Sequence, residues 1–184
     1  EYTGLGRKLS RVLVHGRNIF VLDQGKDEIY QYELDPELPD VAKPVGEGPV
    51  IYKGQQVGQV VVSELADMAW LTAEGYQDKS GLLVLDQAGR LFLSDVSGMW
   101  EPTQLPLALP EEWQYPQSVE TYWGNFYVLE PSQNQIFRYE PSGGGYNEPP
   151  SRYFEADTLV NLGGVVDMAI SSEPCGGYVY LLYA

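Results

Sequence analysis

A β-hairpin pattern occurs three times along this 184-residue chain and constrains its fold more than any other feature. In each copy an apolar strand ends in an acidic residue, a polar turn follows, and a second apolar strand begins. The acidic residues are Asp23, Asp86 and Glu130, and the second strands begin at Ile29, Leu91 and Ile136. Turns rich in glycine, asparagine, aspartate and proline between such runs are typical of hairpins. A fourth copy begins at Tyr180, and the sequence ends there at Ala184.

A further strand precedes each hairpin and makes the repeat longer. Segments 66–70 and 166–170 share Asp-Met-Ala, and segments 10–14 and 117–121 take the same place in the other two units. With Ala184 in the fourth acid position, the units repeat at 63, 44 and 54 residues. Runs at 50–52, 100–105 and 152–155 are predicted to be the outer strands. Repeats of about 40–50 residues with four short strands each are typical of propeller blades.

The sequence therefore predicts an all-β fold: a β-propeller fragment of four-stranded antiparallel blades that form an incomplete ring. We expect one partial propeller domain over residues 1–184, with blade-like units at 8–55, 60–108 and 113–156 and an incomplete unit at 160–184. The last unit stops inside an apolar run, which would leave an open strand edge. We therefore expect the chain to be a fragment of a larger protein.

The repeat resembles those of six-bladed propellers of the NHL, TolB-like and YWTD superfamily. The residues that carry the resemblance are Asp67-Met68-Ala69, Leu83-Val84-Leu85-Asp86, Arg90-Leu91-Phe92, Phe126-Tyr127-Val128-Leu129-Glu130 and Gln135-Ile136-Phe137-Arg138-Tyr139. The resemblance implies that the ring is closed either by the remaining blades of a parent chain or by a second copy. It also implies that acids on the inner strands hold a divalent ion in the enzymatic members.

Charge and rare residues restrict the partners and the chemistry. The formal charge is −15, which disfavours nucleic acid and anionic membrane surfaces and favours cationic peptides, basic protein patches or metal ions. The same charge also suits a role in solubility alone. Cys175 is the only cysteine and His15 the only histidine, so an internal disulfide and multi-histidine zinc sites are excluded. No run is apolar and long enough to insert in a membrane, and the composition favours an extracytoplasmic, bacterial protein.

Acidic residues recur at two positions of the unit. Asp23, Asp86 and Glu130 are interpreted as turn residues that accept backbone N–H bonds, with a cation-binding ring of carboxylates as the alternative. The heads of the inner strands are predicted to be Ser10, Asp67, Ser118 and Asp167, near the central channel. Following the resemblance, Asp67 and Asp167 are the candidate metal ligands, and calcium is the ion they would suit.

Several aromatic residues fall in segments predicted to be loops. The candidate ligand-binding residues are Tyr76, Trp113, Tyr115, Tyr122 and Trp123. Rigid rings supply contact area at little entropic cost, so such residues suit recognition of a protein, a peptide or a glycan. The alternative is that they fill the space between blades, which is the role expected of Trp70.

The predicted function is a non-catalytic binding or scaffold module of a larger protein, because residues suited to catalysis are scarce. Two alternatives are a calcium-dependent hydrolase or lactonase that uses Asp67 and Asp167, and a purely structural spacer domain.

Overall fold

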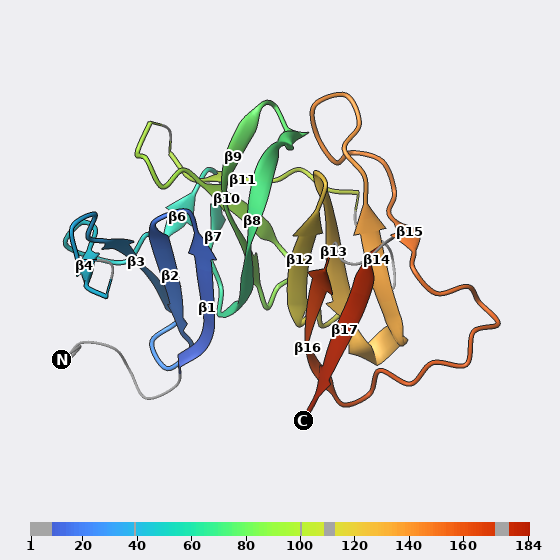
Figure 1. The fold of residues 1–184 in the computed structure, drawn as a ribbon. Coiled ribbons are helices and arrows are strands. Elements are labelled where there is room, and N and C mark those ends of the chain that lie inside the picture. The colour runs from blue at the N-terminus through green and yellow to red at the C-terminus, as the bar shows by residue number, and fades with distance from the viewer. Residues whose placement is uncertain (1–8, 39, 100, 109–112, 172–176) are drawn as a thin grey trace.

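The computed structural model describes residues 9–38, 40–99, 101–108, 113–171 and 177–184, and within them the protein is all-β. Four antiparallel sheets follow one another along the chain, as Figure 1 shows. A small separate hairpin is formed by β6 (Gln56–Val57) and β7 (Val60–Val61). Cys175 and Trp100, the first residue of one predicted outer strand, lie outside the described residues.

Sheets 1 and 2 occupy the first half of the chain. Sheet 1 consists of β1 (Leu9–His15), β2 (Asn18–Asp23) and β3 (Glu28–Leu34), and both β4 (Ala42–Pro44) and β5 (Ile51–Tyr52) pair with β3. Sheet 2 consists of β8 (Leu65–Tyr76), β9 (Lys79–Asp86), β10 (Leu91–Ser94) and β11 (Thr103–Gln104). In both sheets the predicted hairpin forms the middle and the predicted outer strand pairs at its edge.

Sheets 3 and 4 complete the series. Sheet 3 consists of β12 (Ser118–Tyr122), β13 (Asn125–Glu130), β14 (Gln135–Tyr139) and β15 (Ser151–Arg152), with a 3-10 turn, η1 (Pro131–Gln133), between β13 and β14. Sheet 4 consists, in the described residues, of β16 (Val165–Ser171) and β17 (Tyr178–Tyr183). The predicted fold class is confirmed: the antiparallel sheets are blade-like, and they do not close a ring.

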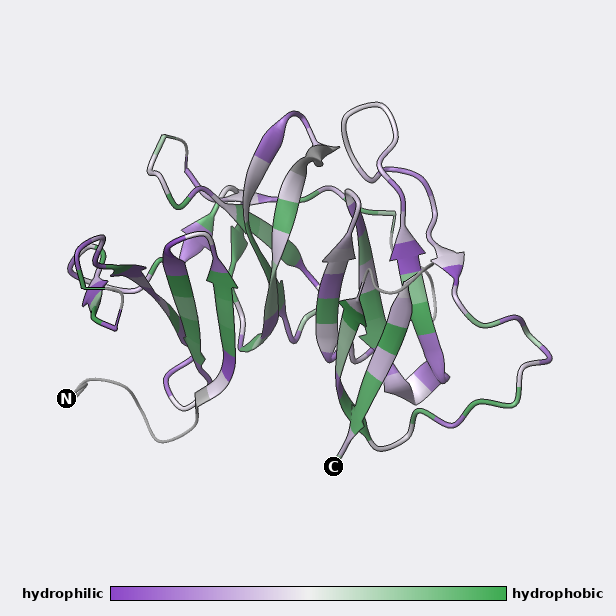
Figure 2. Cartoon of the chain, in the orientation of Figure 1, coloured by the Kyte–Doolittle hydropathy of each residue, from purple (hydrophilic) through white to green (hydrophobic). Residues whose placement is uncertain are grey.

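The first strands of successive sheets lie side by side, β1 beside β8, β8 beside β12, and β12 beside β16. Apolar side chains fill the three spaces between neighbouring sheets. In sheet 2, which has a neighbour on both faces, every residue from Gly81 to Asp86 is buried. Burial on both faces explains why these strands are continuous apolar runs, which Figure 2 shows as green segments within the sheets. Each buried leucine contributes roughly 1.5–3 kcal/mol.

Pairing between the first and second strands establishes which residues are equivalent in the four sheets. Arg11 pairs with Leu22, Asp67 with Leu85, Ser118 with Leu129 and Asp167 with Leu182. A register shift follows the first residue of the strand in sheets 1, 2 and 4. The bulge adds one residue, so the predicted alignment is wrong by one position in two units. Arg11, not Ser10, takes the inner position of sheet 1, and Tyr183, not Ala184, takes the acid position of sheet 4.

Candidate functional site

The four equivalent inner residues meet in one polar network. The Arg11 guanidinium forms ion pairs with Asp67, at 3.1 Å from Nε to Oδ1, and with Asp167. The Ser118 hydroxyl donates to Asp67 Oδ2 at 2.7 Å and to Asp167 Oδ1 at 3.0 Å. The contacts therefore form a closed circuit of four side chains, one from each sheet. We call these four residues the axial network.

Glu120 adds a third carboxylate to this network by pairing with Arg11. One guanidinium therefore faces three carboxylates, and two of these are well buried. Burial raises the pKa of Asp67 to about 7, although Arg11 and hydrogen bonds from Ser118 and the Val119 N–H oppose the shift. Burial also raises the pKa of Glu120. Burial alone would lower the pKa of Arg11, but its three carboxylate partners outweigh it and raise that pKa.

The predicted metal ligands Asp67 and Asp167 are brought into this one network, as a shared site would require. However, the Arg11 guanidinium lies between them and pairs with both. Among the described residues, no group of three or more histidine, cysteine, aspartate or glutamate side chains is arranged to hold a metal ion. The donor set fits a guanidinium, not a calcium ion, and we derive no chemistry through a metal.

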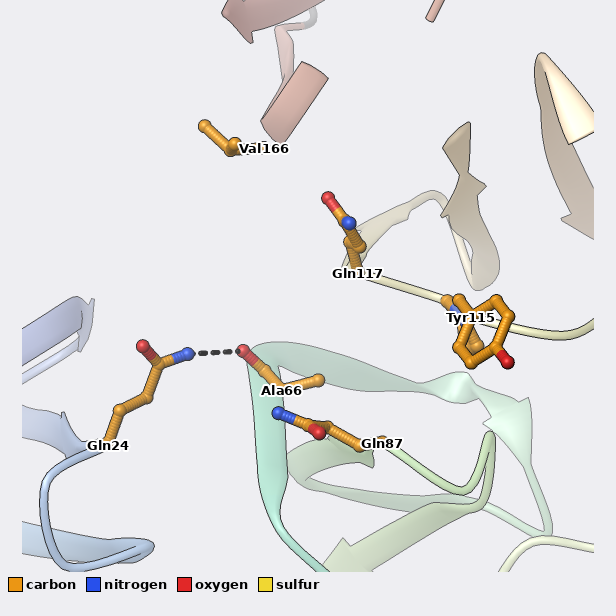
Figure 3. A pocket seen from close by; sticks show the side chains of 7 residues that line it. Gln24, Ala66, Gln87, Tyr115, Gln117 and Val166 are labelled. Atoms are coloured by element: carbon orange, nitrogen blue, oxygen red, sulfur yellow. Dashed lines mark hydrogen bonds between the residues drawn. The ribbon is translucent and has the colours of Figure 1, made fainter. Parts of the chain in front are cut away.

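A hollow opens beside the axial network where the first strands begin. It has a volume of about 420 Å³, and a second hollow of about 320 Å³ shares four of its lining residues and reaches Arg11, Asp67 and Asp167. Figure 3 shows side chains from all four sheets around it. The lining residues are Gln24, Ala66, Gln87, Tyr115, Pro116, Gln117 and Val166. We call this space the axial hollow.

Amide groups give the axial hollow its hydrogen-bonding capacity. Gln24 and Gln87 each follow a recurring acid at the start of a turn, and Gln117 immediately precedes Ser118. Gln24 Nε2 donates to the Ala66 carbonyl at 3.3 Å, which joins sheet 1 to sheet 2 at the rim (Figure 3). Each amide offers both donors and an acceptor, so the rim can bind polar groups of either kind.

Tyr115 is the aromatic candidate that lines the axial hollow. Its side chain is 67% exposed, and its backbone N–H donates to Glu130 Oε2 at 2.6 Å. The neighbouring N–H of Gln114 donates to the same oxygen at 2.9 Å. Glu130 is itself fully buried, so the segment that carries Tyr115 is attached to a fixed point of sheet 3.

The recurring acids act as turn residues, which confirms the interpretation from the sequence. Asp23 accepts the N–H of Gly25 at 2.9 Å, and Asp86 accepts the N–H groups of Arg90 at 2.9 Å and Ser63 at 3.1 Å. All three acids, Asp23, Asp86 and Glu130, are fully buried. They therefore do not form an exposed ring of carboxylates.

Two of the aromatic candidates lie in the core, which corrects the loop placement. Tyr76 is 7% exposed and belongs to the cluster between sheets 2 and 3. Trp113 packs against the same cluster, stacking on Phe137 at 6.3 Å, and its buried Nε1 has no hydrogen-bond partner within the described part of the chain. Both rings fill space between sheets, the alternative role considered for them.

Tyr122 and Trp123 lie at the far end of β12 from the axial hollow. Trp123 is 83% exposed, has φ of +51°, and its ring stacks on Tyr122 with centroids 5.5 Å apart. His15 is also exposed, at the end of β1, and stacks on Trp70 at 3.8 Å. These residues are separate from the axial hollow because they end the strands whose beginnings form it.

Arg11, Glu120 and the three glutamines were not identified from the sequence. The bulge before Arg11 hides its equivalence with Asp67, so spacing alone assigns the wrong residue. A usable signal did exist for two glutamines, because Gln24 and Gln87 both follow the recurring acid.

Comparison with known proteins assigns no family to this chain. No family model matches it, and no curated protein matches its sequence. In the described residues, no helix is long and apolar enough to cross a membrane. Function must therefore be argued from the site itself.

Proposed function

We propose that this domain is a non-catalytic binding module that holds a segment of a protein or peptide in the axial hollow. The observation that carries the proposal is a hollow of about 420 Å³ lined by residues of four sheets, three of them glutamines. Ligand sites typically span about 300–1,000 Å³ and combine a few polar groups with aromatic surface. The glutamine amides can pair with peptide groups, and Tyr115 supplies the aromatic surface.

The charge around the axial hollow favours a basic side chain in the ligand. The network below it has three carboxylates for one guanidinium, and the Asp167 side chain remains 38% exposed. The chain as a whole carries −15. An uncompensated carboxylate in a partly closed site attracts a lysine or arginine more strongly than one in open water does.

The residues suited to catalysis are placed against an enzymatic role. Asp67 is held by Arg11, Ser118 and the Val119 N–H. His15, the only histidine, stacks on Trp70 at the opposite end of β1. A general base needs to reach a substrate proton at hydrogen-bonding distance, and neither group is free to do so at the axial hollow.

The assignment to the NHL, TolB-like and YWTD superfamily of six-bladed propellers remains part of this proposal. Its support is that three sheets share the same strand order, the same buried acid and the same inner position in the pairing register. A placement in a larger, extracytoplasmic bacterial protein is likewise proposed, on composition alone.

The binding proposal is tested with arrays of short peptides and of neutral oligosaccharides, probed with the same labelled protein. We expect binding to peptides that contain lysine or arginine, and no binding when glutamate replaces the basic residue. Tyr115→Ala and Gln87→Ala should each weaken binding by about tenfold, as for residues central to an interface. Gln59→Ala, an exposed glutamine in the β6–β7 turn, is the matched control and should bind normally.

Binding to oligosaccharides alone would replace the peptide proposal with a glycan one. Binding to neither array would favour the spacer role. Peptide binding that survives both Tyr115→Ala and Gln87→Ala would move the site away from the axial hollow.

A further inference from the structure

Two apolar positions on the second strand of each sheet are buried in the first three sheets and exposed in the fourth. By strand pairing the equivalent pairs are Phe20 and Leu22, Leu83 and Leu85, Tyr127 and Leu129, and Tyr180 and Leu182. In the first three pairs no side chain exceeds 7% exposure, because the next sheet covers them. Tyr180 and Leu182 are 56% and 60% exposed.

The first strand of sheet 1 shows the converse. Met68, Val119 and Met168 face the preceding sheet and are at most 1% exposed, whereas the equivalent Val12 is 59% exposed. Val14, two residues further on, is also 59% exposed. We call Val12 and Val14 the sheet-1 face.

The exposed side of sheet 4 is formed by Ala169, Tyr178, Tyr180 and Leu182, which we call the sheet-4 face. Tyr180 pairs with Ala169 across the two strands, and a shallow hollow of about 220 Å³ lies along the same side chains. β17 is visible as a largely hydrophobic segment in Figure 2. Exposed apolar surface of this kind on a folded domain marks an interaction site.

The two faces are the unused halves of an interface that occurs three times within the chain. In each occurrence, second-strand residues of one sheet pack on first-strand residues of the next, as Leu22 packs with Met68 in one apolar cluster. The sheet-4 face is such a second-strand half, and the sheet-1 face is such a first-strand half. Every copy of this chain carries both.

We propose that the sheet-4 face of one copy packs on the sheet-1 face of a second copy. The occupant follows from the complementarity, because a second copy presents the very type of surface that covers the equivalent residues inside the chain. Neither face contains a charged residue, although the chain carries −15. The contact is therefore apolar and is opposed only by long-range repulsion between the copies. Added salt screens that repulsion and strengthens the association.

The test measures molecular mass by light scattering and sedimentation, from about 5 to about 200 µM, at low and high salt. The wild-type chain should associate with increasing concentration, and more strongly at high salt. Leu182→Glu and Val14→Glu should each weaken association by at least about tenfold, because each places a charge in an apolar contact. Leu159→Glu, at a fully exposed position outside both faces, should associate like the wild type.

Mixing the two variants separates this arrangement from other modes of association. Val14→Glu retains an intact sheet-4 face and Leu182→Glu an intact sheet-1 face, so the mixture should form a heterodimer although neither variant associates alone. Pairing of two β17 edges would instead leave Val14→Glu associating normally, which would overturn the proposal. A wild-type chain that stays monomeric at every concentration and salt would also overturn it. Melting curves check that each variant is folded.

Discussion

Arg11 and Asp167 form an ion pair between the first and last sheets of the chain, although 156 residues separate them in the sequence. Because Ser118 bonds to both Asp67 and Asp167, the pair completes a circuit through all four sheets. An incomplete ring of sheets is thus joined at its axis by side chains. Loss of one member should affect the stability of the whole domain.

Replacing Arg11 is expected to destabilise the protein strongly at about pH 8. Arg11→Met would leave Asp67, a buried carboxylate, without its guanidinium, and removing one partner of a buried ion pair costs about 3–5 kcal/mol. Urea denaturation followed by circular dichroism measures the free energy of unfolding.

Arg17→Met provides the control for that measurement. Arg17 pairs with Glu33 at 3.4 Å, but both side chains are about half exposed. Exposed pairs contribute about 0–1 kcal/mol. Similar losses in the two variants would show that the axial network does not stabilise the fold.

The pH dependence of stability should reflect Asp67. Burial raises its pKa in the folded chain from 3.8 to about 7. Between these values the folded chain holds a proton that the unfolded chain has lost, so the free energy of unfolding decreases as pH rises. Asp67→Asn cannot titrate, and its profile should be flatter, by at most about 1.4 kcal/mol per pH unit.

Denaturation of both proteins at several values from about pH 4.5 to about pH 7.5 checks this expectation. A wild-type profile parallel to that of Asp67→Asn would contradict it. A wild-type stability that rises more steeply with pH than the variant's would show that Arg11 outweighs burial.

Much of the fold could be predicted because sheets with two covered faces leave a strong sequence pattern. The apolar runs at 82–85 and 126–129 are buried strands that end in a buried acid, and both the hairpins and the outer strands are found where expected. A bulge leaves no such pattern. For that reason Arg11, one residue after the predicted Ser10, could not be aligned with Asp67 from spacing alone.

The packing of Trp113 can be tested through Gly89. A Cβ added at Gly89 would lie 2.3 Å from Trp113 Nε1, and Gly89 has φ of +77°. Gly98 has φ of +74° with no atom within 4 Å of an added Cβ. Gly98→Ala should therefore cost about 1 kcal/mol from backbone strain alone, and Gly89→Ala about 1–3 kcal/mol more from the clash.

Urea denaturation and tryptophan fluorescence measure both glycine variants. The emission of the folded Gly89→Ala protein should change because Trp113 must move, whereas that of Gly98→Ala should not. Equal stability losses with unchanged emission would place Trp113 outside the core.

Trp123 occupies a position that its backbone disfavours. It has φ of +51° and precedes Gly124 with φ of +74°, in the two-residue turn between β12 and β13. Such turns favour Asn-Gly. Trp123→Asn should stabilise the protein by about 0.5–1 kcal/mol, whereas Trp123→Ala should not, because alanine does not favour this conformation. Thermal melting compares them, and a less stable Trp123→Asn would show that stacking on Tyr122 outweighs the strain.

The candidate site was less predictable than the fold because it depends on which side chains meet at the axis. The recurring acids at 23 and 86 could be assigned to turns from their position alone. Tyr76 and Trp113 looked like loop residues because the sequence does not show which rings the neighbouring sheet covers. Tyr115 was identified correctly as exposed, but its attachment to Glu130 requires the fold.

The most direct test of the account is a double-mutant cycle on Arg11 and Asp167, using Arg11→Met, Asp167→Asn and the double variant. The central claim is that these two residues hold the first and last sheets together at the axis. If so, the free energies of unfolding are non-additive, with an interaction of about 0.5–3 kcal/mol, as for residues in one ion-pair network. Additive losses within about 0.3–0.5 kcal/mol would show that the two sheets do not meet at the axis and would contradict the account.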